Sequence, residues 1–140
     1  MNARTTIALI VTAALPAAAV TAAGTAAEAD AAALQRGRQV YTRCAGCHAI
    51  EGNRTGPQHC GLFGRRAGTA PGYDGYSPAM RASGIVWDAR TLDRFLAAPT
   101  DVVRGTTMGY AGIHDPRERA DLIAWLRDAA RPGGRCRVIR

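Results

Sequence analysis

The sequence predicts an all-α fold of about 3–5 helices joined by ordered loops. Three segments place apolar residues at helical spacing, and two of them begin with an aspartate suited to capping a helix. No segment keeps the alternation of apolar and polar residues that indicates a strand, and none is repeated. The loops between the helices are long and rich in glycine and proline. Such loops are uncommon in a compact domain unless they have a function, which predicts that a cofactor orders them.

Residues 1–29 are expected to be a secretory signal peptide. A short basic start, Met1 to Arg4, precedes an apolar, alanine-rich stretch from Thr5 to Val20 and a run of small residues. We place the cleavage site between residues 19 and 29, with Ala27-Glu28-Ala29 as one candidate. The alternative is an uncleaved N-terminal anchor, although the stretch is short and only weakly apolar for a membrane span. Cleavage leaves about 110 residues, enough for one domain with a modest core.

This domain is predicted to extend over residues 30–131, followed by a basic C-terminal tail over residues 132–140. Its first helix is predicted over residues 31–43, where apolar and arginine side chains recur at helical spacing. The C-terminal end of that helix leads directly into the most informative motif of the chain.

The motif is Cys44-Ala45-Gly46-Cys47-His48, and C-x-x-C-H is the attachment site of a c-type haem. Two thiols at this spacing can add across the two vinyl groups of one porphyrin, and the adjacent histidine can ligate the iron. A bare C-x-x-C also occurs in disulfide redox centres and in zinc sites. A zinc site needs two further ligands at close spacing, but the remaining candidates are scattered: His59, Cys60, His114 and Cys136. A thioredoxin-like centre needs βαβ alternation, which the sequence lacks.

The rest of the domain is predicted as loop, helix, loop and helix. Residues 51–72 are expected to be an ordered loop. Asp88 is a plausible N-cap for a helix over residues 89–97, and Pro99 limits its continuation. Asp115-Pro116-Arg117-Glu118 combines a capping aspartate, a proline at the first helical position and a glutamate three residues after the cap. That last helix ends before Pro132 and has an apolar face formed by Leu122, Ile123, Trp125 and Leu126.

A haem held by one histidine has a second axial position, for which the chain offers Met1, Met80 and Met108. Met1 belongs to the predicted signal peptide. Met108 lies in a non-helical stretch between two predicted helices, which favours it over Met80. A thioether is a soft ligand that favours the ferrous state and raises the reduction potential. For either residue, the alternative is a core methionine with no ligand role.

The formal charge of the chain is +7, and arginine alone supplies the positive charge because there is no lysine. A basic protein of this kind is expected to dock on acidic surfaces of its partners. Nucleic acid is not an expected partner, because the chain shows no interleaving of basic and aromatic residues and no known binding motif. His59, His114 and the carboxylates are interpreted as surface or loop residues.

Seven short motifs follow one another in residues 34–129: Cys44-Ala45-Gly46-Cys47-His48, Thr55-Gly56-Pro57, Gly61-Leu62-Phe63-Gly64-Arg65, Ala70-Pro71-Gly72-Tyr73, Gly84-Ile85-Val86-Trp87, Gly105-Thr106-Thr107-Met108 and the segment 118–126. In this order they resemble the class I cytochromes c, specifically the branch of mitochondrial cytochrome c and bacterial cytochrome c2. The resemblance implies the cytochrome c fold, in which helices and ordered loops wrap around one covalently bound haem c.

The resemblance also implies roles for single residues. His48 would be the proximal and Met108 the distal ligand of the iron, with Cys44 and Cys47 as the attachment points. The carbonyl of Pro57 would accept a hydrogen bond from the imidazole of His48. Residues that bind or lie beside the haem propionates are matched by Arg65, Tyr76, Trp87 and Thr106. The residues at which the family's first and last helices contact each other are matched by Gly37, Tyr41, Leu122 and Trp125. Tyr110 matches an aromatic residue that the family has at the exposed haem edge.

The chain departs from the family pattern in its tuning and docking residues. Phe95 replaces a tyrosine that usually donates a hydrogen bond near the methionine sulfur. The docking lysines are absent, and arginines such as Arg43, Arg54, Arg81 and Arg104 are expected to substitute for them.

Two further cysteines are not needed by the family, and we expect Cys60 and Cys136 to form a disulfide. Two spare thiols in an exported chain are more often paired than free. In the family fold, the two regions that contain these cysteines approach each other. The bond would tether the C-terminal tail to the haem domain. Two unrelated thiols, or an intermolecular bridge, are the alternatives.

The sequence therefore predicts a soluble, exported, monomeric, monohaem electron carrier of the bacterial periplasm. Electrons would pass through the haem edge by outer-sphere transfer, so no catalytic residue and no stable membrane insertion are expected. The partners would be redox proteins: an oxidase, a bc1 complex, a photosynthetic reaction centre or a periplasmic dehydrogenase. The alternative is a haem enzyme or gas sensor, such as a small peroxidase or a nitric-oxide-binding protein, with a labile sixth ligand.

Overall fold

The computed structural model of the protein describes residues 25–136, so most of the predicted signal peptide and the end of the tail lie outside the described residues. The described part contains five helices: α1 (Ala26–Tyr41), α2 (Pro78–Ala82), α3 (Ala89–Ala97), α4 (Pro99–Val102) and α5 (Pro116–Ala129). Across these residues, extended pairing is limited to isolated bridges between Arg66 and Val86 and between Pro132 and Cys136. The all-α prediction is therefore confirmed. No helix in residues 25–136 is both long enough and apolar enough to cross a membrane.

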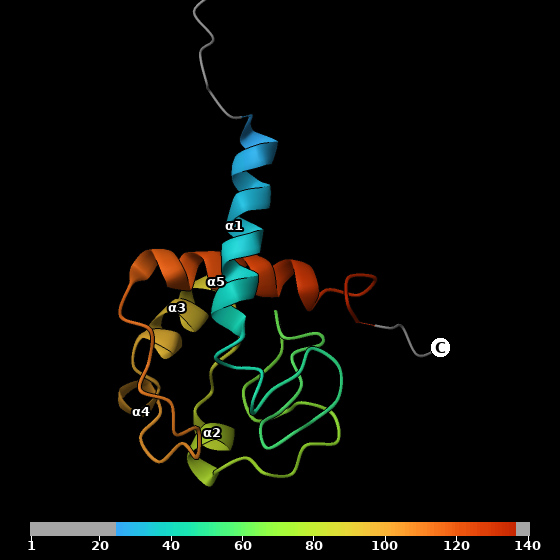
Figure 1. The fold of residues 1–140 in the computed structure, drawn as a ribbon. Coiled ribbons are helices and arrows are strands. Elements are labelled where there is room, and N and C mark those ends of the chain that lie inside the picture. The colour runs from blue at the N-terminus through green and yellow to red at the C-terminus, as the bar shows by residue number, and fades with distance from the viewer. Residues whose placement is uncertain (1–24, 137–140) are drawn as a thin grey trace, which may run out of the picture.

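Helix α1 crosses α5, and the segment that connects them, residues 42–115, is arranged below this crossing (Figure 1). Gly37 allows the close approach, because a Cβ atom there would collide with the backbone carbonyl of Asp121 and lie 2.7 Å from the Cβ of Trp125. One turn further along α1, the ring of Tyr41 packs on the indole of Trp125 with a centroid separation of 4.4 Å. The expected contact between the first and last helices is present at these residues.

Ion pairs link the crossing helices at two points. The guanidinium of Arg36 donates to both carboxylate oxygens of Asp121, at 2.6 and 3.0 Å. The guanidinium of Arg43, just beyond α1, donates to both oxygens of Glu118, at 2.6 and 2.7 Å. Paired, parallel hydrogen bonds of this kind fix orientation as well as adding energy.

The helix starts follow the capping signals in the sequence, with one difference. Asp88 accepts a hydrogen bond from the backbone of Thr91 in a capping box, and Asp115 caps α5 by accepting from the backbone of Arg117. Glu118 has the spacing of a capping-box residue, three positions after the cap, but it does not bond back to the helix start. Its carboxylate instead forms an ion pair with the distant Arg43.

Two short helices were not predicted. Helix α2 begins with Ser77 as its cap and Pro78 as its first residue, and α4 begins at Pro99, which was expected to limit helix continuation. Proline is well tolerated at a first helical position because its missing N–H has no intrahelical partner there. Pro99 therefore ends α3 and starts a new turn of helix.

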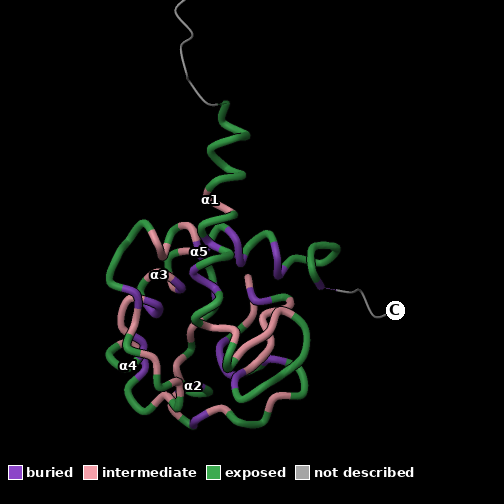
Figure 2. Tube along the Cα trace, in the orientation of Figure 1, coloured by how far each residue is buried: buried purple, intermediate pink, exposed green. Residues whose placement is uncertain are grey.

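Many of the buried residues lie where α5 packs on α1 and on α3, whereas the first half of α1 stands exposed outside the body of the protein (Figure 2). The most buried apolar side chains include Leu122, Ile113, Ala129 and Leu126, each at most 3% exposed. A disulfide joins Cys60, in the loop after α1, to Cys136, beyond α5, with Cα atoms 5.6 Å apart. The disulfide therefore holds the start of the C-terminal tail against the loop.

The glycine at the helix crossing supplies the first prediction. Gly37→Ala should lower the free energy of unfolding by about 1–3 kcal/mol, because the added methyl group overpacks the contact with Asp121 and Trp125. Denaturant unfolding measures this change. The control is Gln39→Ala on the exposed side of the same helix, which should stay within about 0.5 kcal/mol of the wild type. Equal stabilities of the two variants would contradict a close crossing at Gly37.

The disulfide supplies the second prediction. Replacing both Cys60 and Cys136 by serine should lower stability by up to about 4 kcal/mol, because the bond closes a long loop in the unfolded chain. A reducing agent should destabilise the wild type but leave the double variant unchanged. Thiol titration of the unfolded, unreduced haem-loaded protein should find neither cysteine reactive. Two reactive thiols per chain would show that the bond does not form.

Candidate functional site

A cavity of about 490 Å³ is lined by the C-x-x-C-H segment, by loop residues and by side chains of α3 and α5. Every residue that the sequence predicted to bind the haem or its iron lines this one cavity: Cys44, Cys47, His48, Pro57, Arg65, Tyr76, Trp87, Thr106 and Met108. The wall between these residues is largely apolar and includes core residues of α3 and α5. A volume of this size, mostly apolar with a few convergent polar groups, is typical of a small-molecule or cofactor site.

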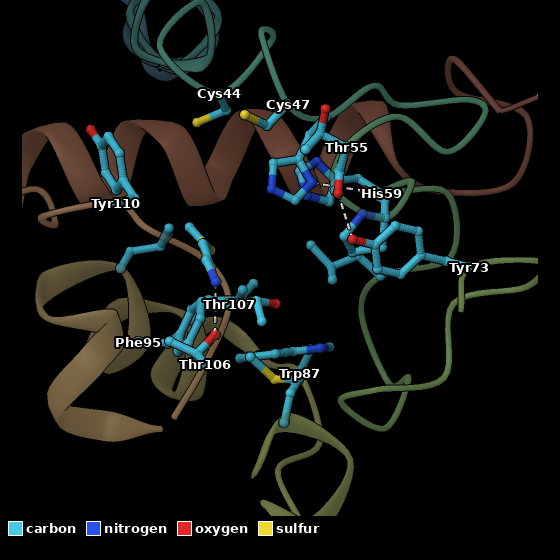
Figure 3. A pocket seen from close by; sticks show the side chains of 18 of the residues that line it. Cys44, Cys47, Thr55, His59, Tyr73, Trp87, Phe95, Thr106, Thr107 and Tyr110 are labelled. Carbon is cyan, nitrogen blue, oxygen red and sulfur yellow. Dashed lines mark hydrogen bonds between the residues drawn. The ribbon is translucent and has the colours of Figure 1, made fainter. Parts of the chain in front are cut away.

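The C-x-x-C-H segment reaches the cavity because it continues α1 by one tight turn. The amides of Cys47 and His48 both donate to the carbonyl of Cys44, at 3.1 and 2.9 Å. This turn places Cys44 and Cys47 together at one end of the cavity that both line (Figure 3). Cys47 is exposed, whereas Cys44 is partly buried and burial raises the pKa of its thiol. Both thiols are unbridged in the structure and available for attachment.

The imidazole of His48 is held at its Nδ1 atom. That atom lies 2.8 Å from the carbonyl oxygen of Pro57, and burial lowers the pKa of the ring. A neutral imidazole that donates from Nδ1 has its Nε2 lone pair available for a metal. Gly56 makes room for the ring, because a Cβ atom there would collide with it. The structure thus has the hydrogen bond that the resemblance implied.

Arg65 presents an unpaired donor in the cavity wall. Its two terminal nitrogens donate to the carbonyls of Cys60 and Gln58, at 2.6 and 2.9 Å. Its Nε is buried and has no hydrogen-bond partner among residues 25–136. Burial also lowers the pKa of the guanidinium. A buried charged donor without a partner is costly, so this atom is suited to an anionic group of a bound cofactor.

The other predicted propionate contacts lie around the same wall. The hydroxyl of Tyr76 accepts a hydrogen bond from the backbone of Ala70 at 3.3 Å. Trp87 is buried, and its ring packs against Phe95 with a centroid separation of 5.1 Å. The hydroxyl of Thr106 accepts from the backbone of Met108 at 3.2 Å. Their positions are compatible with propionate contacts, which stay a prediction.

Both candidate methionines line the cavity. Met80 belongs to α2 and is 6% exposed within the core cluster, whereas Met108 is partly buried in the non-helical segment between α4 and α5. Location in the cavity wall alone does not choose between them. The choice of Met108 rests on its loop and on the motif that precedes it.

His59 lines the cavity, although its place in the sequence does not predict this. Both histidines lie in loops, as expected, and His114 is exposed, but His59 is only partly exposed. Its ring lines the cavity and stacks on the ring of His48, with centroids 4.6 Å apart. Burial lowers the pKa of His59 to about 3, and burial raises the pKa of the neighbouring Tyr41 to about 12, so both side chains are neutral at physiological pH. No periodicity or motif in the sequence indicated this position.

Comparison with known proteins agrees with this geometry. The family model described as cytochrome c matches residues 34–130. The chain belongs to the cytochrome c family. It is 44% identical to cytochrome c of Chlamydomonas reinhardtii over 107 residues, which covers 74% of this chain and 95% of the relative. It is 42% identical to cytochrome c2 of Rhodomicrobium vannielii over 94 residues, covering 65% of this chain and 74% of the relative.

A solved structure shares the cytochrome c fold. Cytochrome cH from Methylobacterium extorquens superposes with a TM-score of 0.65 at 39% identity, and the match covers 67% of this chain and 96% of the solved one. Cytochromes c are electron-transfer proteins that bind haem c covalently, and this chain is one of them. The cavity fits such a group, because it brings together two thiols, a neutral imidazole, two thioethers and an unpaired arginine nitrogen.

The distal ligand supplies the third prediction. Met108→Ala should abolish the weak far-red absorption that arises from methionine sulfur bound to ferric iron, and it should increase binding of external ligands. The matched control is Met80→Leu, a volume-conserving change in the core that should retain the band. Loss of the band in Met80→Leu but not in Met108→Ala would assign the ligand to Met80 instead.

Proposed function

We propose that this cytochrome c is an exported, periplasmic carrier that moves single electrons between redox proteins of a respiratory or photosynthetic chain. The observation that carries the proposal is the convergence of the C-x-x-C-H turn and the Met108 loop on one cavity. The predicted signal peptide and the likeness to a cytochrome c2 support a location outside the cytoplasm. A terminal oxidase, a bc1 complex, a photosynthetic reaction centre or a periplasmic dehydrogenase would be the partner.

In this proposal, Cys44 and Cys47 attach the haem, and His48 and Met108 hold its iron. When bound, haem c supplies an iron that alternates between the ferrous and ferric states. The protein would surround that iron with a largely apolar cavity wall and hold His48 through the carbonyl of Pro57. These restraints limit the movement of His48 when the charge of the iron changes. Arg65 offers its unpaired Nε to an anionic substituent of the haem.

The assignment of the attachment sites can be checked by digestion. Trypsin should cut after Arg43 and Arg54, so the peptide of residues 44–54 should carry the mass of one haem. The added mass should survive acid-acetone treatment because thioether bonds are covalent. Haem that extracts freely would refute attachment at Cys44 and Cys47.

The arginines expected to replace the docking lysines differ in their surroundings. The charge of Arg43 is balanced by Glu118, and Arg54 donates to the carbonyl of Ala45 at 2.6 Å. Arg81 donates to the carbonyls of Gly68 and Asp74 and packs over the ring of Tyr76. Arg104 is exposed like the other three, but within residues 25–136 its guanidinium forms no hydrogen bond or ion pair, and its loop leads to the cavity-lining residues around Met108. We therefore assign the docking role mainly to Arg104 and expect Arg43 to contribute little.

The fourth prediction concerns docking. The rate of electron transfer to an acidic redox partner should fall as ionic strength rises, because exposed charges are screened over about 10 Å at 0.1 M salt. Stopped-flow kinetics measure this rate. Arg104→Gln should slow transfer at low salt and reduce the salt dependence, whereas Arg43→Gln should have the smaller effect on the slope. A rate that stays flat from low to high salt would contradict electrostatic docking.

A further inference from the structure

His59 covers one face of the imidazole that the proposed function assigns to the iron. The two histidine rings are nearly parallel, with an angle of 19° between their planes and centroids 4.6 Å apart. The other constraint on His48 acts on the edge of the ring, where Nδ1 meets the carbonyl of Pro57. One contact therefore holds the edge of the ring and the other holds its face.

The backbone that carries His59 is fastened to the segment that follows His48. The amides of His59 and Cys60 donate to the carbonyls of Ala49 and Ile50, at 3.0 and 2.9 Å. Arg65 holds the carbonyls on either side of His59, and the disulfide to Cys136 joins the same segment to the end of the chain beyond α5. Because these bonds surround His59, its ring is carried on a segment with little freedom to shift relative to His48.

Tyr41 fixes the ring of His59 from a different part of the fold. Its hydroxyl oxygen lies 3.1 Å from Nδ1 of His59, and the two rings meet edge to face at 5.7 Å. Tyr41 itself is 8% exposed and packs on Trp125 of α5. Burying a polar ring in an apolar wall is costly unless the ring is hydrogen-bonded. The contact between the hydroxyl of Tyr41 and Nδ1 of His59 meets this hydrogen-bonding need for both side chains. Figure 3 shows His59 in the wall of the cavity.

We propose that Tyr41 and His59 act together as positioning residues that set the plane of the His48 imidazole. The inference rests on the proposed function, since it takes His48 to be the proximal ligand. A role in packing alone would be met by any side chain of similar size. A positioning role requires that the two residues act as a unit, since the hydroxyl of Tyr41 orients the ring that orients His48.

The test uses the haem-loaded protein and the variants His59→Leu, Tyr41→Phe and their combination. The orientation of the axial imidazole affects how unpaired spin is distributed over a ferric haem. Proton NMR of the four haem methyl groups reports that distribution, and redox titration reports the potential. His59→Leu should change the spread of the methyl shifts and displace the potential. Tyr41→Phe should produce a smaller change in the same direction, and it should add nothing in the His59→Leu background.

Two controls separate positioning from general loss of stability. Ile113→Val loses a buried methyl group at a residue that does not line the cavity, and His114→Leu removes an exposed histidine, so both should keep the wild-type methyl shifts. Wild-type shifts in His59→Leu, or fully additive effects of the two substitutions, would overturn the proposal.

If His59→Leu does not accumulate, His59→Phe can replace it, because phenylalanine retains a ring without the hydrogen bond. The same criteria then apply to His59→Phe and Tyr41→Phe. Failure of the proposed function would be recognised separately, as a high-spin ferric spectrum of the wild type.

Discussion

The structure depends on a core that is also the wall of a cofactor site. Leu122 is fully buried in the packing between helices, yet it lines the same cavity as His48 and Met108. Phe95 of α3 is likewise shared between the core and the cavity wall. A domain of this size has few apolar residues to spare, so the haem of a cytochrome c must complete its packing. The same cavity is therefore the place where the helices pack and where the haem-binding residues meet.

The polar groups of the site are delivered by elements that this packing holds in place. The crossing at Gly37 fixes the end of α1, and the C-x-x-C-H turn follows within the next residues. The loop after it is held by its own backbone bonds, by Arg65 and by the disulfide. These restraints converge on the segment that carries Pro57 and His59. An electron carrier benefits from such rigidity, because little structural change is then needed when the iron changes charge.

Local sequence signals predicted much of this arrangement. The capping aspartate and the proline bounded α3 at residues 89–97, and the motif of two cysteines and a histidine identified the cofactor. The sequence did not predict what depends on distant partners. Glu118 has the spacing of a capping residue, but Arg43, 75 positions away, takes its carboxylate. His59 is a loop histidine, and only the fold brings its ring into contact with both Tyr41 and His48. Helix α2 has a serine cap and a first-position proline, but its five residues are too few to show helical periodicity.

Hydrogen exchange on a haem-free form of the protein shows whether the haem completes the core. The variant with both Cys44 and Cys47 replaced by serine, prepared without haem, would be compared with the loaded wild type. Without haem, amides in α3 and α5 should lose most of their protection, because the residues that line the cavity lose their packing partner. Full protection of α3 and α5 in the haem-free variant would contradict this expectation.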